Sequence, residues 1–507
     1  MKCCARLVFA LVLASLVACQ SRAPEASPPS VAVDAPSVSS AMPFDFAWDD
    51  RSPFRGGLIP SEQSALEGLA GASVYHMDLQ IADDLVHLTG RQDVRYTNQE
   101  TVPLDGVYFR LYPNLFGGSV TIHAVQVNDR DVGPAYELAD SAVRVPLSPA
   151  LGPGEQAVIK IAFSVTVPTE GGGNYGVFAF LDGVLALAHF YPMIPVYDDE
   201  GWNLEIPPEQ GDVVYADSSF YLVRVTAPAD LTLVASGVEV ERQGMGDRQQ
   251  VTFAGGPMRD FYLAGSKRYT AVSEQVGETR VNGYVLEGFA REGKTVLRFA
   301  VNALKVFNDR FGVYPFTEFD VVGTPTQAYG VEYPGVVAIA LRLYDPTQRE
   351  NYPLPYLEST VAHEVGHQWF YSVVGNDQLD EPWVDEAVVQ YATLLYWLDL
   401  YGAAGASGFR ESLYGRWDQV ARAEIPIGLP VRDYKGREYG AIVYGRGPLF
   451  LEELSKKLGR GTFDAFLRDY YEVHKWGIAT ADSLKGLAEI HCDCDLTPMF
   501  ADWVYGQ

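Results

Sequence analysis

The spacing of apolar residues changes along this chain and divides it into two regions of different secondary structure. From Ser73 to about Gly265, short runs such as 74–81 and 220–225 alternate apolar with polar residues, and clusters of Gly, Pro, Asp or Asn separate them. A period of two predicts strands with one buried face. Since no helical period interrupts these runs for long, we expect an antiparallel all-β domain over 61–268.

Helical periods dominate after about Tyr269. Residues 292–310 carry apolar side chains at spacings of three and four, as an amphipathic helix does. Two strand-like pieces and four more helical segments follow: strands at 319–322 and 335–341, and helices at about 356–373, 382–400, 440–457 and 462–473. This order predicts an α+β second domain over 269–507, in a chain whose 507 residues suffice for two or three domains.

The first nineteen residues have the composition of an export signal. Lys2 and Arg6 precede the apolar stretch 7–18, which is shorter than the about 20 residues of a membrane-spanning helix. The run Leu-Val-Ala-Cys that ends at Cys19 resembles the lipobox of bacterial lipoproteins, in which the cysteine is lipidated and becomes the new N-terminus. Gln20 after it favours the outer membrane. The resemblance implies a lipid anchor in the bacterial cell envelope, at the outer membrane's periplasmic side or the cell surface. The alternative is ordinary cleavage with Cys19 incidental.

The segment that follows is expected to be a tether over 20–60. Ser, Pro and Ala dominate 20–45, and no apolar period occurs there. Such a composition cannot bury enough apolar surface to fold.

Two histidines and a later glutamate have the spacing of a metal centre. In the motif His-Glu-Val-Gly-His at 363–367, the helical repeat places His363 and His367 on one face, one turn apart. Two histidines hydrogen-bonded in a helix are the alternative. Nineteen residues after His367, Glu386 lies near the start of the next helix. Because a catalytic zinc uses three protein ligands and one open position, this set predicts one zinc ion per chain.

These motifs resemble those of the gluzincin aminopeptidases, the family of aminopeptidase N and leukotriene hydrolase. In that family HExxH is followed by eighteen residues and a glutamate, as in this sequence. Other segments similar to family motifs are 367–370 (HQWF), 383–387 (WVDEA, beside WLNEGFA), 329–334 (YGVEYP, beside GxMEN) and 443–447 (VYGRG, beside the segment with the catalytic tyrosine). The resemblance runs from about residue 73 to the end. It implies a multidomain chain whose β domain precedes a thermolysin-like α+β zinc peptidase domain.

The resemblance and the chemistry together suggest how the metal centre would work. Zinc on His363, His367 and Glu386 would lower the pKa of a bound water and polarise the scissile carbonyl. Glu364 would take the proton of that water and return it to the leaving amine.

The family's other motifs imply a site for the substrate. The GxMEN glutamate maps onto Glu332, which would pair with the substrate's free α-ammonium, and Gly330 lies in the same substrate-binding motif. A tyrosine would donate to the oxyanion of the tetrahedral intermediate. We expect Tyr444 in this role rather than Tyr434 or Tyr439, because it alone precedes a Gly-Arg-Gly sequence.

The sequence departs from the family pattern at two places. Val331 and Tyr333 replace the methionine and asparagine of GxMEN, which alters the first specificity pocket. Only 63 residues follow Tyr444, so we expect no large C-terminal helical domain and a more open cleft.

The expected function is therefore a zinc-dependent aminopeptidase that hydrolyses the N-terminal peptide bond with a zinc-activated water. A thermolysin-like endopeptidase would share the zinc ligands, but the carboxylate of Glu332 would then be desolvated without a partner. A non-catalytic peptide-binding lipoprotein would need neither Glu364 nor Tyr444. Epoxide hydrolysis, as in leukotriene hydrolase, stays open, although no residue indicates it.

Charge and cysteine content limit the other partners. The 65 acidic and 38 basic residues give a net charge of −27, which disfavours nucleic acid. Cys492 and Cys494 lie beside His491, but two thiolates and one imidazole make a poor zinc site, so we expect a local disulfide or two free thiols. The expected partners are peptides with a free N-terminus and, through the lipid, a membrane. No obligate protein partner is indicated.

Overall fold

The computed structural model describes residues 44–506, which lie within one compact unit of the chain. The export signal, Cys19 and the tether up to residue 43 lie outside the described residues. The domain boundaries predicted from the sequence stay predictions.

Residues 44–60, the last part of the predicted tether, contain folded structure. The 3₁₀ turn η1 (Ser52–Gly57) begins in this part, and the side chains of Phe44, Phe54 and Leu58 are buried. The ring of Phe54 packs on that of Phe220 with centroids 5.0 Å apart. A few large apolar side chains thus anchor a segment whose composition alone suggests disorder.

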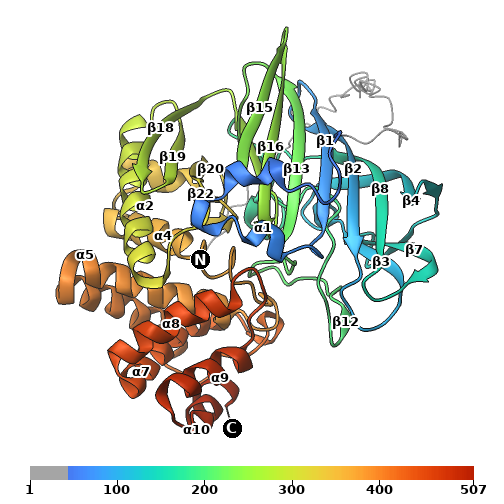
Figure 1. Cartoon of the computed structure of the whole chain (residues 1–507). Coiled ribbons are helices and arrows are strands. Elements are labelled where there is room, and N and C mark those ends of the chain that lie inside the picture. Colours follow the sequence, from blue (N-terminus) through green and yellow to red (C-terminus); the bar gives the residue numbers. More distant parts are fainter. Residues whose placement is uncertain (1–43, 507) are drawn as a thin grey trace, which may run out of the picture. The chain divides into compact units, whose positions relative to one another are not determined.

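An eight-stranded sheet dominates the first region, in the order β15-β16-β13-β1-β2-β8-β4-β5 (Figure 1). Its strands are β1 (Val74–Ile81), β2 (His87–Thr97), β4 (Ser119–Val127), β5 (Arg130–Asp131), β8 (Gln156–Thr166), β13 (Ser219–Pro228), β15 (Val238–Met245) and β16 (Arg248–Met258). All neighbours are antiparallel except β1 and β13, which are parallel. The all-β prediction is confirmed, with one parallel pair that local alternation could not reveal.

Three smaller sheets complete this region. Their orders are β3-β7-β6, β14-β17-β10-β9 and β11-β12. The strands are β3 (Leu104–Arg110), β6 (Ala135–Glu137), β7 (Ala142–Leu151), β9 (Phe178–Leu181), β10 (Val184–Leu187), β11 (Tyr197–Asp198), β12 (Gly201–Trp202), β14 (Thr232–Ala235) and β17 (Leu263–Ser266), and the short helix α1 (Ala65–Gly68) precedes them all.

A mixed five-stranded sheet begins the second region, in the order β18-β19-β20-β22-β21. Its strands are β18 (Tyr269–Val276), β19 (Thr279–Leu286), β20 (Glu318–Thr324), β21 (Gly330–Tyr333) and β22 (Val336–Ala340). The strands expected at 319–322 and 335–341 are β20 and β22, whereas β18 and β19 were not expected. Most side chains of β18 are exposed, which explains its weak apolar pattern. β21 is an edge strand, and Pro334 follows it directly, where a missing N–H costs little.

Helices make up most of the rest of this region (Figure 1). They are α2 (Ala290–Phe311), α3 (Leu341–Tyr344), α4 (Leu354–Gly366), α5 (Trp383–Trp417), α6 (Glu438–Ala441), α7 (Gly447–Leu458), α8 (Arg460–His474), α9 (Ala481–Cys492) and α10 (Thr497–Phe500). The amphipathic helix α2 packs on β18 and β19, and α4 packs against α2, α5 and the β21–β22 hairpin. Among the helices of residues 44–506, none is both long enough and apolar enough to cross a bilayer.

Two of these helices end differently from the expectation. α4 stops at Gly366, before a tight turn in which Tyr371 has a φ of 121°. α5 extends to Trp417 and is broken at Gly402, whose φ is 66°. Both ends matter, because the turn after α4 and the second half of α5 border the site described below.

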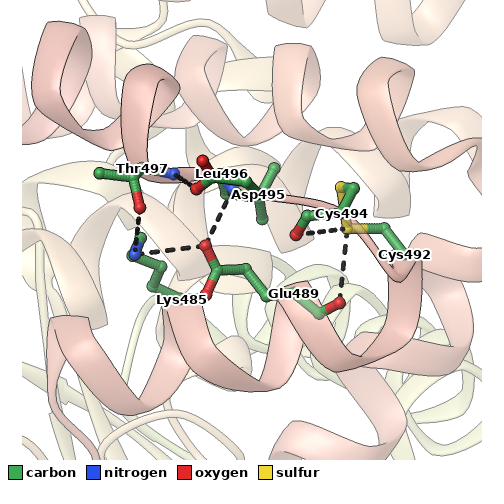
Figure 2. Close-up of a disulfide and its surroundings, with 7 residues drawn as sticks. All are labelled: Lys485, Glu489, Cys492, Cys494, Asp495, Leu496 and Thr497. Carbon is green, nitrogen blue, oxygen red and sulfur yellow. Dashed lines mark hydrogen bonds and ion pairs between the residues drawn. A yellow bond between two sulfur atoms is a disulfide. The ribbon is translucent and has the colours of Figure 1, made fainter.

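Cys492 and Cys494 form a disulfide at the end of α9 (Figure 2). His491 does not join them, because its Nε2 lies 3.0 Å from the Asp469 carboxylate. Glu489 accepts a hydrogen bond from the backbone N–H of Leu496 at 2.9 Å, which ties the following segment to the helix (Figure 2). Of the two expected states, the disulfide is the one observed.

Candidate metal centre and active site

The C-terminal half of helix α4 is held by core packing. Leu357, Val361 and Val365 are fully buried. His363 and Glu364 are also largely buried, because α5 and β21 cover the face that carries them. Packing therefore fixes the direction of both polar side chains before any ligand binds.

The structure brings His363, His367 and Glu386 together. Nε2 of His363 lies 3.2 Å from Nε2 of His367. Oε2 of Glu386 lies 3.1 Å from the first of these nitrogens and 3.5 Å from the second. Four ligands around a zinc ion at about 2.0–2.1 Å are separated by about 3.3 Å, so the three atoms have the spacing of a tetrahedral zinc site.

The chemistry of these atoms also fits a cation. Burial lowers the pKa of His363 to about 4, which keeps its imidazole neutral. Although burial opposes it, hydrogen bonds with His363 and His367 hold the pKa of the Glu386 carboxyl below its usual range. A carboxylate and two nitrogen lone pairs that converge on one point repel one another unless a cation lies between them.

A second layer of polar groups orients His367. Its Nδ1 lies 2.7 Å from Oδ1 of Asp385, and the other oxygen of Asp385 accepts from Gln378 at 2.8 Å. Such a carboxylate on the far nitrogen fixes the tautomer in which Nε2 is free to bind a metal. Asp385 and Gln378 were not assigned roles from the sequence. The signal for Asp385 was its place beside a metal ligand on a helix.

Glu364 and Glu332 lie beside the three-residue set but are not part of it. Glu332, Glu364 and His367 form a second group of acidic and imidazole atoms within 4.8 Å of one another. Burial, only partly offset by the nearby His367, raises the pKa of both carboxyls well above the usual range. Gly330 begins the same edge strand as Glu332, and a Cβ there would lie 2.3 Å from Oε1 of Glu364. Only glycine leaves room for that carboxylate.

Tyr444 reaches the set His363, His367 and Glu386 from the π-helical turn η8 (Ile442–Arg446). Its hydroxyl donates to Oε1 of Glu386. A Cβ on Gly447 would lie 2.6 Å from Cβ of Ala387, so the glycine lets this turn pack closely on α5. Burial raises the pKa of Tyr444 well above its usual value, which keeps the phenol a donor at neutral pH.

The other two candidate tyrosines have different positions. Tyr434 donates to backbone carbonyls, including that of Ile427 at 2.9 Å, and so has a structural partner. Tyr439 is buried, with its ring centroid 5.6 Å from that of Tyr444. Of the three, Tyr444 is the one whose hydroxyl bonds to a residue of the three-residue set.

A cavity of about 1050 Å³ opens over these residues. His363, Glu364, Glu386, Glu332 and Tyr444 all line it. The all-β region contributes further lining residues, namely Tyr175, Gln210, Gly211 and Asp212.

Asp212 was missed from the sequence. Burial and the charges of Glu332 and Glu386 raise the pKa of its carboxyl well above the usual range. It precedes Glu332 by 120 residues, in a segment between strands with no motif, so only the folded chain reveals that it lies near them.

Comparisons with known proteins agree with this geometry. Residues 296–503 match the peptidase family M1 domain. The chain is 27% identical over 302 residues to aminopeptidase 2 of Candida albicans, which covers 54% of this chain and 31% of that protein. It is 23% identical over 301 residues to a probable aminopeptidase 2 of Sulfurisphaera tokodaii, covering 56% and 38%. The chain thus spans only about a third of the length of these relatives.

Solved structures show the same fold over most of the chain. An M1 zinc metallopeptidase from Deinococcus radiodurans superimposes with a TM-score of 0.63 at 20% identity, covering 85% of this chain and 93% of that one. A variant of that enzyme bound to a Tyr-Ser-Ala substrate gives a TM-score of 0.64 at 20% identity, covering 86% and 94%. The expected succession of a β region and a zinc-peptidase fold is confirmed.

Proposed function

We propose, on the premise that residues 296–503 are a peptidase family M1 domain, that this chain is a zinc-dependent aminopeptidase. It would hydrolyse the first peptide bond of peptides with a free N-terminus. One observation carries the proposal: His363 and Glu386, which group with His367, line the same cavity as the buried carboxylate of Glu332. The first group fits a metal ion, and the second fits an ammonium group.

His363, His367 and Glu386 would hold the zinc ion. When bound there, zinc supplies Lewis acidity toward the scissile carbonyl and toward water. Glu364, which is not part of that set, takes the proton of the attacking water and passes it to the leaving amine. A raised pKa makes this carboxylate a better acceptor for the proton of the water.

Glu332 and Asp212 would receive the substrate's α-ammonium. Both carboxylates are desolvated, which raises the pKa of each, and the charge of Glu332 raises that of Asp212 further. An ammonium group relieves this repulsion, whereas an internal peptide segment would bring only neutral amides. This difference favours an aminopeptidase over a thermolysin-like endopeptidase, because it ties the scissile bond to the chain's first residue.

The phenol of Tyr444 would stabilise the transition state. In the free protein its O–H donates to Glu386, and with substrate bound it can turn to the oxygen on which negative charge develops. A donor that gains strength only as charge develops raises kcat rather than binding.

Two variants of one site separate metal binding from catalysis. Glu386→Ala should lose most of its zinc, measured by inductively coupled plasma mass spectrometry, together with its activity on alanine p-nitroanilide. Glu364→Gln should keep about one zinc per chain and still be inactive, because only the proton acceptor is lost. Full zinc occupancy in the Glu386 variant would remove that residue from the site, and an active Glu364 variant would overturn the mechanism.

We further propose that the chain is lipid-anchored in a bacterial cell envelope, with Cys19 as the lipidated residue. The support is the Leu-Val-Ala-Cys run after a short apolar stretch. Cys19→Ser should abolish labelling by an alkyne-tagged palmitate and release the protein from membranes. A wild-type chain that is unlabelled and stays in the soluble fraction would refute the anchor.

A further inference from the structure

Two arginines in the catalytic cavity have no acidic partner. Within the described part of the chain, Arg416 and Arg437 are the only arginines that line the cavity, and no lysine lines it. Within residues 44–506, neither guanidinium forms a hydrogen bond or an ion pair that would neutralise it. The contact seen for Arg416 is with the ring of Tyr444, whose centroid lies 5.8 Å from the guanidinium carbon.

Three neighbouring arginines have carboxylate partners. Arg410 on α5 forms an ion pair with Glu452 at 2.6 Å. Arg422, just after α5, pairs with Asp418 at 2.6 Å, and Arg432 pairs with Asp380 at 2.8 Å. In a chain with a net charge of −27, two arginines without a carboxylate partner inside a cavity are unusual. An anionic ligand that binds there would explain them.

The cavity is consequently polarised. Asp212 and Glu332 contribute negative charge to its lining. Arg416 lies on α5 and Arg437 directly precedes α6, and these two helices pack against each other. A free peptide has the same arrangement of charge, with an ammonium at one end and a carboxylate at the other. A planar guanidinium matches a carboxylate particularly well, because it can donate two parallel hydrogen bonds.

We propose that Arg416, assisted by Arg437, binds the C-terminal carboxylate of short peptides, and that di- and tripeptides are the preferred substrates. This proposal rests on the aminopeptidase function and names its substrate class. Tyr444 hydrogen-bonds to the metal ligand Glu386, and Arg416 lies against its ring. An extended chain advances about 3.3–3.6 Å per residue, so the carboxylate one or two residues beyond the scissile bond comes within reach of this guanidinium.

The test compares free acids with amides of one sequence. Trialanine and trialanine amide present the same backbone and the same ammonium, and only the acid carries a terminal charge. Release of the first alanine is measured by chromatography, and kcat/KM is determined for each substrate, with dialanine and its amide as a second pair. A charge-assisted hydrogen bond contributes about 10- to 100-fold, so the wild-type enzyme should prefer the acid by that factor, mainly through KM.

Variants assign the preference to a residue. Arg416→Gln should reduce the acid-to-amide ratio to near one by losing rate on the acid, while its rate on the amide stays close to wild type. Arg437→Gln should reduce the ratio in the same direction but less, because this arginine is more exposed. Arg422→Gln is the matched control: it removes an arginine from the same region, outside the cavity lining, and should leave the ratio unchanged.

The outcomes separate this proposal from the function on which it rests. If Arg416 only supports the ring of Tyr444, Arg416→Gln will slow acid and amide equally, and the proposal falls. Equal wild-type rates on acid and amide would also overturn it while the aminopeptidase function stands. If neither substrate loses its first residue, the proposed function fails and the substrate class fails with it.

Discussion

Replacing Gly330 by alanine should disable the enzyme although no charged residue is replaced. A Cβ at this position would lie 2.3 Å from Oε1, 2.5 Å from Cδ and 2.5 Å from Cγ of Glu364. Van der Waals contact begins near 3.4 Å, so the Glu364 side chain must retreat by about 1 Å. The strand cannot yield instead, because Gly330 pairs with Ile339 in the β21–β22 hairpin.

The expected cost follows from that displacement. A catalytic group misplaced by about 1 Å loses on the order of 10²-fold in rate, so kcat on alanine p-nitroanilide should fall by about that factor. Zinc content should stay near one per chain, because the three atoms nearest to the new methyl group all belong to Glu364 and not to a proposed metal ligand. Gly440→Ala is the control: this glycine lines the same cavity, but a Cβ there has nothing within 4 Å, and kcat should be unchanged.

A double-mutant cycle tests the reason as well as the result. Glu364→Asp shortens the side chain and moves its carboxylate away from the new methyl group. Gly330→Ala should therefore lower kcat by a much smaller factor in the Glu364→Asp variant than in the wild-type enzyme. Full activity of Gly330→Ala, or strictly additive losses in the cycle, would refute the claim that this glycine makes room for the base.

Three further perturbations test other parts of the molecule. Tyr444→Phe should lower kcat by about 10²–10³-fold with KM and zinc content nearly unchanged, whereas a loss confined to Tyr439→Phe in the same steady-state assay would move the donor to that residue. Burial lowers the pKa of His76 to about 4 from 6.5, so the unfolded chain binds one more proton between these values and stability falls as pH drops through this window. Urea unfolding at pH 7.5 and pH 5 should show a wild-type loss about 2 kcal/mol larger than that of His76→Phe, and equal losses would exclude His76 as the cause. Arg259→Met should destabilise the protein by about 3 kcal/mol or more in the same assay, because it leaves buried backbone carbonyls without the donor that now bonds to them, and an unchanged unfolding midpoint would contradict that role.

Helical spacing predicted the two histidines of the site, whereas Glu332, Gly330 and Tyr444 were predicted through their resemblance to family motifs. His363 and His367 are one turn apart on a helix, and Glu386 lies near the start of the next one, so periodicity alone brings the first two together. Gly447, in the Gly-Arg-Gly that singled out Tyr444, packs closely on Ala387 in the structure. Such residues can be predicted because their spacing or motif is visible in the sequence itself.

Residues that reach the site only through long-range folding could not be predicted in this way. Asp212 comes from a loop of the β region and Arg416 from the second half of α5, beyond the predicted end of that helix at residue 400. β18 was missed because most of its side chains face solvent. The fold of residues 44–60 depends on a few buried apolar side chains in a polar segment, and composition averages over such anchors.

The most direct test of the central claim is the rate of hydrolysis before and after the substrate's amino group is blocked. The measurement is kcat/KM for an alanine-containing tripeptide and for its N-acetyl derivative, with the zinc-loaded enzyme. Acetylation removes the cation that Glu332 is proposed to bind, and loss of a desolvated charge partner costs about 2–5 kcal/mol. The account predicts that N-acetylation nearly abolishes cleavage. Equal rates on the free and acetylated peptides would contradict it and identify an endopeptidase.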